Sequence, residues 1–156
     1  MPSSKDTHLA TATANLIVVA RAYRSVADHA LSDLDLSQAT AWPIVMIGRL
    51  GEGVRQGALA EALAIEGPTL VRVLDQLVAS GLMLRQEDPT DRRAKTLHLT
   101  EAGRALREKV ETVLIHVRRR VFDGIDEADV GAFLRVLDAL KGSLGKAGSS
   151  PKETKP

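Results

Sequence analysis

The run from residue 57 to residue 100 constrains the fold more than any other part of this chain. Two short helical patterns meet at Glu66-Gly67-Pro68, and a hairpin pattern tipped by Asp91-Arg92-Arg93 follows the second. The second helical pattern repeats apolar residues at i, i+4, i+7 and i+8, which predicts one buried face. That face consists of Leu70, Leu74, Leu77 and Val78, and the opposite face carries Thr69, Arg72, Gln76 and Ala79. A helix, a tight turn, a recognition helix and a charged hairpin, or wing, form an arrangement suited to reading duplex DNA.

Local signals predict where these elements begin and end. Pro68 suits position N1 of the second helix, because its missing N–H needs no partner there, and Gly81 suits the C′ position that stops it. Asp88-Pro89-Thr90-Asp91 fits a type I turn between two short strands. A lone hairpin is marginal in water, so we expect its leucine face to rest on the helices. The predicted inward residues are Leu82, Leu84, Leu97 and Leu99, and the wetter ones are Met83, Arg85, Thr96 and His98.

Helical patterns flank this region on both sides. We expect a long helix over 9–34 and then a helix capped by Ser37, in which Pro43 causes a kink or a late start. Downstream, Thr100 caps a long helix and Asp126 caps the last one. These terminal helices carry more apolar surface than the small core can cover, which predicts a homodimer.

The predicted fold class is therefore mainly α with a small antiparallel β-hairpin wing, a winged helix-turn-helix flanked by dimerisation helices. The expected division is a flexible N-terminus (1–8), a helical dimerisation region (9–34 and 104–145) and a DNA-binding region (35–103). Residues 146–156 are rich in Gly, Ser, Pro and Lys, which predicts a disordered tail.

Composition excludes several classes of protein. The chain has no cysteine, and its four histidines lie on separate elements, so we expect no metal and no cofactor. No apolar stretch approaches the roughly 20 residues that span a membrane, which predicts a cytoplasmic protein with no membrane partner. No P-loop, nucleophile elbow or metalloprotease motif is present, which argues against an enzyme. The net charge is only +1, so any nucleic-acid affinity depends on where the charges lie.

Two segments carry a resemblance to a known family. The first comprises Leu59-Ala60-Glu61-Ala62-Leu63, the stretch from Gly67 to Leu77, and Ser80-Gly81-Leu82. The second is Asp88-Pro89-Thr90-Asp91-Arg92-Arg93-Ala94-Lys95 followed by Leu97-His98-Leu99-Thr100-Glu101-Ala102-Gly103. They resemble the helix-turn-helix and the wing of the MarR family of bacterial transcription regulators, with the order of helices also similar over residues 9–145. The resemblance implies a homodimer on a pseudo-palindromic operator, with recognition helices in major grooves roughly 34 Å apart.

The predicted DNA contacts come from the recognition helix and the wing. Arg72 suits guanine, because its fork can donate two hydrogen bonds to O6 and N7. Thr69 and Gln76 share its face, and Pro68 and Thr69 begin the helix, where backbone N–H groups contact phosphates. The resemblance implies that Asp91 holds Arg93 by a salt bridge for insertion into the minor groove, while Arg92 and Lys95 serve the phosphates. Arg85 and Arg104 are weaker candidates, and Arg118-Arg119-Arg120 fits a helix C-terminus better than DNA.

The family resemblance also implies a small-molecule effector. Many members release DNA when an aromatic or phenolic acid, or in some an acyl-CoA, binds between the DNA-binding lobe and the dimerisation helices. Tyr23, Arg24, Trp42 and Met46 are the candidate lining, since aromatic rings, one cation and an adaptable apolar chain suit an aromatic acid. Trp42 and Met46 are also four residues apart, as two core residues on one helix face would be.

Other interpretations stay open from the residues alone. Arg72 can be a solvated arginine on an exposed helix face, and residues 91–93 a polar hairpin tip. The same surface can bind protein rather than DNA, or the fold can belong to a small-molecule-binding enzyme. Binding anchored on phosphates weakens steeply with salt, whereas an ordinary protein interface need not, so salt dependence separates the first two classes.

Overall fold

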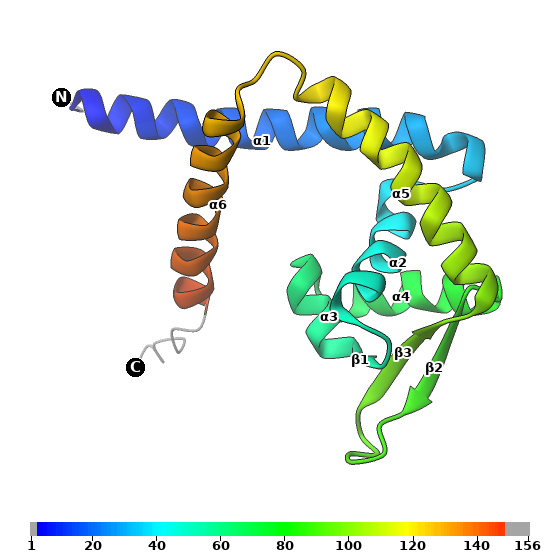
Figure 1. Cartoon of the computed structure of the whole chain (residues 1–156). Coiled ribbons are helices and arrows are strands. Elements are labelled where there is room, and N and C mark those ends of the chain that lie inside the picture. Colours follow the sequence, from blue (N-terminus) through cyan, green and yellow to red (C-terminus); the bar gives the residue numbers. More distant parts are fainter. Residues whose placement is uncertain (1–2, 149–156) are drawn as a thin grey trace, which may run out of the picture. The chain divides into compact units, whose positions relative to one another are not determined.

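The computed structural model describes residues 3–148, and its mainly α content with a small antiparallel sheet confirms the predicted fold class (Figure 1). The chain divides after Arg118 into two compact units. The elements are α1 (Ser4–Leu31), a 3-10 turn (Ser32–Leu34), α2 (Gln38–Leu50), β1 (Val54–Arg55), α3 (Gln56–Leu63), α4 (Gly67–Ala79), β2 (Met83–Glu87), β3 (Lys95–Leu99), α5 (Glu101–Val121) and α6 (Glu127–Gly148).

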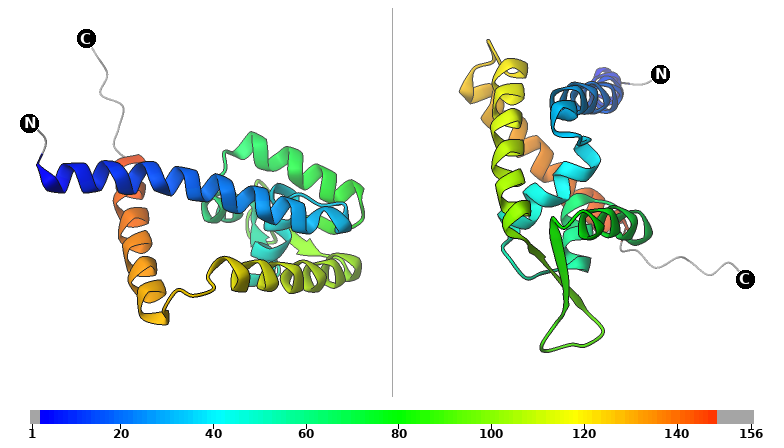
Figure 2. Two further views of the ribbon diagram at one scale, coloured as in Figure 1. Left: turned by 90° about the horizontal axis from the view of Figure 1, so that it is seen from above. Right: turned by 90° about the vertical axis from the view of Figure 1, so that its right-hand side faces the viewer.

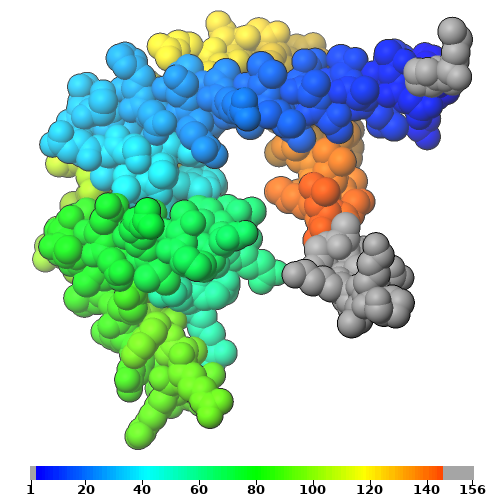
Figure 3. Space-filling view, turned by 180° about the vertical axis from the view of Figure 1, so that it is seen from behind, coloured from blue at the N-terminus to red at the C-terminus, as the bar shows by residue number. Residues whose placement is uncertain are grey.

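The sheet of the first unit has three antiparallel strands in the order β1-β3-β2, one more than the sequence predicted. Val54 and Arg55 of β1 pair with Leu97 and Thr96 of β3. The hairpin of β2 and β3 extends away from the start of α5, to which β3 is joined (Figure 2). Its tip protrudes from the surface of the lobe, as the space-filling view shows (Figure 3). The hairpin therefore has the form of a wing.

The prediction of which β2 residues face the core is wrong, because the observed alternation is shifted by one residue. Met83 is almost fully buried, while Leu84 is 49% exposed. Met83 pairs with Leu99 across the ladder, so it is Met83 that shares the core face with the leucines of β3. On β3 the prediction is confirmed, because Leu97 and Leu99 are both buried.

Two buried clusters hold the first unit together. The first joins α2, α3, α4 and the sheet; its members are Ile44, Ile47, Leu59, Leu70, Leu74, Leu77, Met83, Leu97 and Leu99. The second joins the C-terminal part of α1 to α2 and α5; its members are Ala27, Leu31, Ala41, Val45, Val110 and Leu114. Because α2 contributes to both, it connects the winged lobe to the helices beside it.

The first two helices begin differently from expectation. A capping box between Ser3 and Asp6 starts α1 at Ser4, so the helix begins five residues before the predicted Leu9 and occupies most of the segment expected to be flexible. Ser37 caps α2 as predicted, and its side chain accepts from Thr40 N. Pro43 lies inside α2, so of the two expected outcomes, a kink or a late start, the late start is wrong. Pro43 is buried, and its ring lacks the N–H that would bond the Ala39 carbonyl.

The end of α4 and the start of α5 are joined by hydrogen bonds. Gly81 has φ +71° and, with Leu82, bonds the last carbonyls of α4, which confirms the predicted C′ position. Thr100 caps α5 as predicted: its Oγ1 accepts from Gly103 N at 3.0 Å. The same hydroxyl donates to Gly81 O at 2.7 Å, and Thr100 N donates to Leu82 O at 3.1 Å.

The second unit contains the end of α5 and helix α6. α6 starts directly after Asp126, whose carbonyl accepts from Asp129 and Val130, so the predicted cap position is confirmed. Large apolar side chains of this unit are exposed, among them Phe133, Leu134 and Leu144. Residues 146–148 end α6 instead of belonging to a tail, and residues 149–156 of the predicted tail lie outside the described residues.

Candidate nucleic-acid interface

Helix α4 exposes the residues that the sequence assigned to DNA. Pro68, Thr69, Arg72 and Gln76 are all exposed, and among the described residues none of their side chains has a recorded hydrogen bond or ion pair. Pro68 occupies the second helical position after the N-cap Glu66, not the first as predicted. The polar face is therefore free to meet a partner.

Helix α4 is anchored from behind. Leu70, Leu74 and Leu77 lie in the first buried cluster, as the apolar periodicity predicted, whereas Val78, the fourth predicted member of that face, is 37% exposed. A salt bridge of 2.9 Å joins Asp75 of α4 to Arg85 of β2. Arg85 was a weak candidate for phosphate contact, but its bond with Asp75 ties the wing to the recognition helix. The other weak candidate, Arg104, donates to Leu99 O at 2.7 Å.

The wing turn is built around the buried carboxylate of Asp88. Its Oδ1 accepts from Thr90 N at 2.8 Å and from Thr90 Oγ1 at 2.6 Å. Asp91 N donates to Asp88 O at 3.2 Å, which closes the predicted turn. Asp88 is only 7% exposed although it directly follows β2, where the turn at the tip of the wing begins.

Arg55 completes the turn and was not singled out from the sequence. It lies on β1, and its Nε donates to Asp88 Oδ2 at 2.7 Å, while Nη2 donates to Thr90 Oγ1 at 3.3 Å. The hydrogen bonds from Thr90, together with the one from Arg55 Nε, hold the pKa of the Asp88 carboxyl well below its usual range. Because the two residues are 33 positions apart, only the pairing of β1 with β3 brings them together.

The wing tip differs from expectation in one contact. Asp91 Oδ1 accepts the backbone N–H of Arg93 at 3.0 Å, and no ion pair joins the two side chains within residues 3–148. The predicted salt bridge is therefore wrong, and the guanidinium of Arg93 stays uncommitted. Arg92 and Arg93 are exposed, and Lys95 pairs with Glu87 at 3.3 Å.

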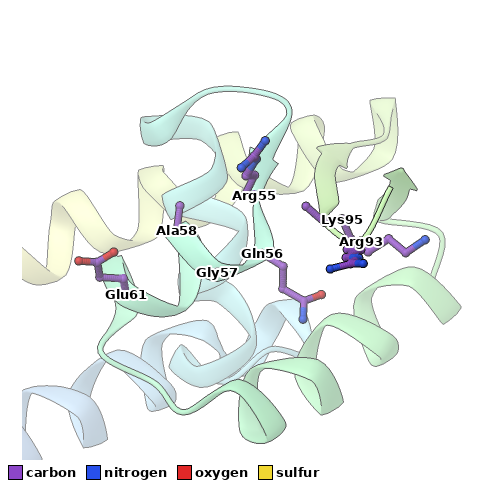
Figure 4. Close-up of a pocket in the computed structure, with 8 residues that line it drawn as sticks. Arg55, Gln56, Gly57, Ala58, Glu61, Arg93 and Lys95 are labelled. Atoms are coloured by element: carbon purple, nitrogen blue, oxygen red, sulfur yellow. The ribbon is translucent and has the colours of Figure 1, made fainter. Parts of the chain in front are cut away.

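A pocket of about 430 Å³ lies between the wing and α3 (Figure 4). The guanidinium of Arg93 is on its wing side and Gln56 on its helix side, while Glu61 lies away from both cations of the wing. The lining residues are Arg55, Gln56, Gly57, Ala58, Glu61, Arg93, Ala94 and Lys95. Arg93 and Lys95 belong to the predicted DNA contacts, and the α3 residues are additions from the structure.

The predicted effector residues are only partly brought together. Tyr23 and Trp42 pack against the second cluster, and Met46 packs against the first. Arg24 is exposed, whereas Arg49 lies 5.4 Å from the centre of the Trp42 ring and 3.6 Å from Glu111. The cation beside Trp42 is thus Arg49, one helix turn from Met46, and not Arg24.

In the part of the chain that the structure describes, no group of three metal-ligating side chains is placed to hold an ion. Within the same residues, no helix combines the length and apolar character needed to cross a membrane.

A recognition helix beside a wing, both fixed to one core, defines a winged helix-turn-helix DNA-binding protein. The sequence profile of the MarR family matches residues 43–95. The chain is 36% identical to transcriptional regulator PA3341, covering 86% of this chain and 98% of that one, with a TM-score of 0.77. The chain belongs to the MarR family of transcriptional regulators.

Two structures from Rhodococcus are also similar. A MarR-family transcriptional regulator from Rhodococcus sp. RHA1 is 27% identical, over 81% of this chain and 89% of that one, with a TM-score of 0.74. CouR from Rhodococcus jostii RHA1, whose structure holds p-coumaroyl-CoA, is 28% identical, over 81% and 88%, with a TM-score of 0.75.

Proposed function

We propose that this MarR-family regulator is a repressor that binds a pseudo-palindromic operator as a homodimer and leaves it when an aromatic acid or its CoA thioester binds. The observation that carries the proposal is the free polar face of α4 beside a wing whose Arg93 has no ion pair among the described residues. Both elements are anchored on one buried cluster, so their spacing is fixed before DNA arrives.

The reading mode follows from side-chain chemistry. Arg72 donates a bidentate pair to guanine, and Thr69 and Gln76 contact neighbouring bases or phosphates from the same face. Arg93 enters the minor groove, where negative potential is strongest in narrow A·T-rich segments. Arg92 and Lys95 contact phosphates and set the register.

The homodimer is supported by unpartnered apolar surface on both units. The N-terminal part of α1 exposes Leu9, Leu16, Ile17, Val18 and Val19, and the second unit exposes Val121, Phe122, Ile125, Phe133, Leu134, Val136, Leu140 and Leu144. Surface of this kind in a soluble regulator marks an interface. A two-fold dimer presents two identical recognition helices, which matches a palindromic operator.

The effector proposal rests on aromatic side chains beside a cation. Tyr23 and Trp42 are partly buried against the cluster that joins α1, α2 and α5, and Arg49 lies over the Trp42 ring. An aromatic acid can stack on the rings while its carboxylate meets the guanidinium. The p-coumaroyl-CoA held by CouR supports an aromatic thioester as one candidate class.

The DNA half of the proposal is tested by replacing Arg72. Selection of duplexes from a random library first gives the preferred sequence of the parent, and Arg72→Ala is then assayed on that duplex and on single-base variants. We expect a loss of roughly 1–3 kcal/mol of discrimination at one guanine in each half-site, with weaker losses elsewhere.

Arg120→Ala is the matched control, because Arg120 is an exposed arginine of α5 outside the winged lobe. It should leave base preference unchanged. Unchanged preference in Arg72→Ala as well would refute the reading mode, and binding that does not weaken with salt would favour a protein-binding module.

A further inference from the structure

The short loop between α2 and β1 directs one carboxylate onto the wing. The loop comprises Gly51, Glu52 and Gly53, and its two glycines have φ values of +103° and +81°. Glycine adopts positive φ without the strain that a side chain would cause, so the two glycines set the direction of Glu52. Gly53 N donates to Leu97 O at 2.9 Å, which attaches the loop to β3.

Glu52 supplies a hydrogen bond that a longer β1 would make. Val54 of β1 lies opposite Leu97, so Leu99, two residues further along β3, lies opposite the loop and not opposite β1. Glu52 Oε2 accepts from Leu99 N at 2.9 Å, and Arg104 Nη1 of α5 donates to Leu99 O at 2.7 Å. Two side chains thus satisfy both main-chain groups of the last residue of the wing.

Two ion pairs of opposite polarity join the end of α2 to α5. In the first, the acid is Glu52, which follows α2, and its Oε1 lies 3.6 Å from Nη1 of Arg104. In the second, the base is Arg49 of α2, and its Nη2 lies 3.6 Å from Oε1 of Glu111. The guanidinium of Arg49 also lies 5.4 Å from the centre of the Trp42 ring. A displacement of α2 relative to α5 therefore changes both ion pairs and the position of the charge beside Trp42.

We propose that Glu52 is a positioning residue that makes α2 and the wing move together when DNA binds. Its carboxylate connects the end of α2 to the last residue of β3, and the next residue, Thr100, is bonded to the main chain after α4. A change in the wing on DNA therefore shifts α2, and a change at α2 alters the affinity for DNA by the same factor. The proposal rests on the DNA binding proposed above and adds the residue that couples it to α2.

The test uses Trp42, the single tryptophan of the chain, as a reporter on α2. Tryptophan emission is recorded as the preferred duplex is added, and the affinity is measured in parallel by anisotropy of a labelled duplex. Free tryptophan amide corrects for light that the DNA absorbs. The parent should show a saturable change in emission that follows the binding curve, because the charge of Arg49 moves relative to the ring.

Two substitutions of Glu52 separate the reach of its side chain from its charge. Glu52→Asp keeps the charge but is one methylene shorter, so its carboxylate no longer reaches Leu99 N. It should bind the duplex and lose most of the change in emission. Glu52→Gln removes the charge but keeps an oxygen that can accept from Leu99 N, so it should retain most of the change.

Glu61→Asp is the matched control. Glu61 is an exposed acid of α3 in the same unit, and its side chain has no recorded hydrogen bond or ion pair among the described residues. Its emission change and its affinity should equal those of the parent. Circular dichroism before each titration verifies that every variant is folded.

The outcomes separate this proposal from the proposed function. A full change in emission in Glu52→Asp would overturn the role of Glu52, and so would its loss in Glu52→Gln. A parent that binds the duplex with no change at Trp42 would show that DNA binding is not coupled to α2. If the parent binds no duplex at all, the proposed function is what fails.

Discussion

Gly103 is the position at which the smallest change should have a large effect. It lies in the first turn of α5, and a Cβ there would overlap the carbonyl oxygen of Leu82 and lie 3.0 Å from the carbonyl carbon. The same Cβ would be 3.4 Å from Leu99 Cβ. The Leu82 carbonyl is fixed, because it accepts from Thr100 N at 3.1 Å. Gly103→Ala therefore forces either the carbonyl or the start of α5 to move.

The magnitude follows from three contributions. Overpacking costs about 1–3 kcal/mol, and weakening the bond from Thr100 to Leu82 costs about 0.5–1.5 kcal/mol. Alanine in place of glycine within a helix returns about 1 kcal/mol. The net loss in free energy of unfolding is roughly 2 kcal/mol, which lowers the melting temperature of a chain this size by roughly 4–8 °C.

The assay is thermal unfolding followed by circular dichroism, at one protein concentration because dimerisation makes the midpoint depend on concentration. Gly57→Ala is the control, since a Cβ there meets nothing within 4 Å and only the helix-propensity gain remains. It should melt at or slightly above the parent temperature. A Gly103→Ala protein that melts as high as Gly57→Ala would refute the reasoning.

Two further predictions concern pH and ligand. The pKa of Asp88 is lowered in the folded state, so its contribution to stability is present above the unfolded value, about 4, and is lost as the pH falls further. Asp88→Asn should lower the urea midpoint at neutral pH, and below about pH 4 the midpoint of the variant should decrease less with falling pH than that of the parent. If the midpoints of the variant and the parent decrease equally below that pH, Asp88 does not have this role. An effector of the proposed class, an aromatic acid or its CoA thioester, added at 100 times its dissociation constant should stabilise the folded protein by about 2.7 kcal/mol and release DNA, and Trp42→Ala should remove both effects. No shift in melting temperature across a broad panel of aromatic acids and thioesters would end the effector proposal.

The sequence predicted the fold correctly where a local pattern, such as a cap residue or helical periodicity, was enough to define a helix or its end. The leucines of α4, the Gly81 stop and the Ser37 and Thr100 caps all act through neighbours in sequence, and the structure confirms them. β1 was missed because a two-residue strand between glycines shows no alternation. The face of β2 was misassigned because Leu82 belongs to the turn after α4, which leaves Met83 as the first inward residue.

The candidate site was predictable only in its exposed part. Arg72 and Gln76 could be placed on the free face of α4 because helical periodicity fixes which side is buried. The partner of a wing carboxylate could not be placed, because it depends on strand pairing between distant residues. Asp91 was expected to hold Arg93, whereas Asp88 is the residue bound to an arginine, and that arginine comes from β1.

The hydrogen bonds of Thr100 connect the end of the recognition helix directly to the start of α5. One threonine bonds two carbonyls beyond the end of α4 while capping α5, and Gly103 lets the two backbones touch. No flexible spacer of the usual loop kind separates the hairpin from α5, since β3 ends at Leu99 and the helix begins at Glu101. We therefore expect a tilt of α5 to move the C-terminal end of α4 with it, because these hydrogen bonds join the residues that follow α4 to the start of α5.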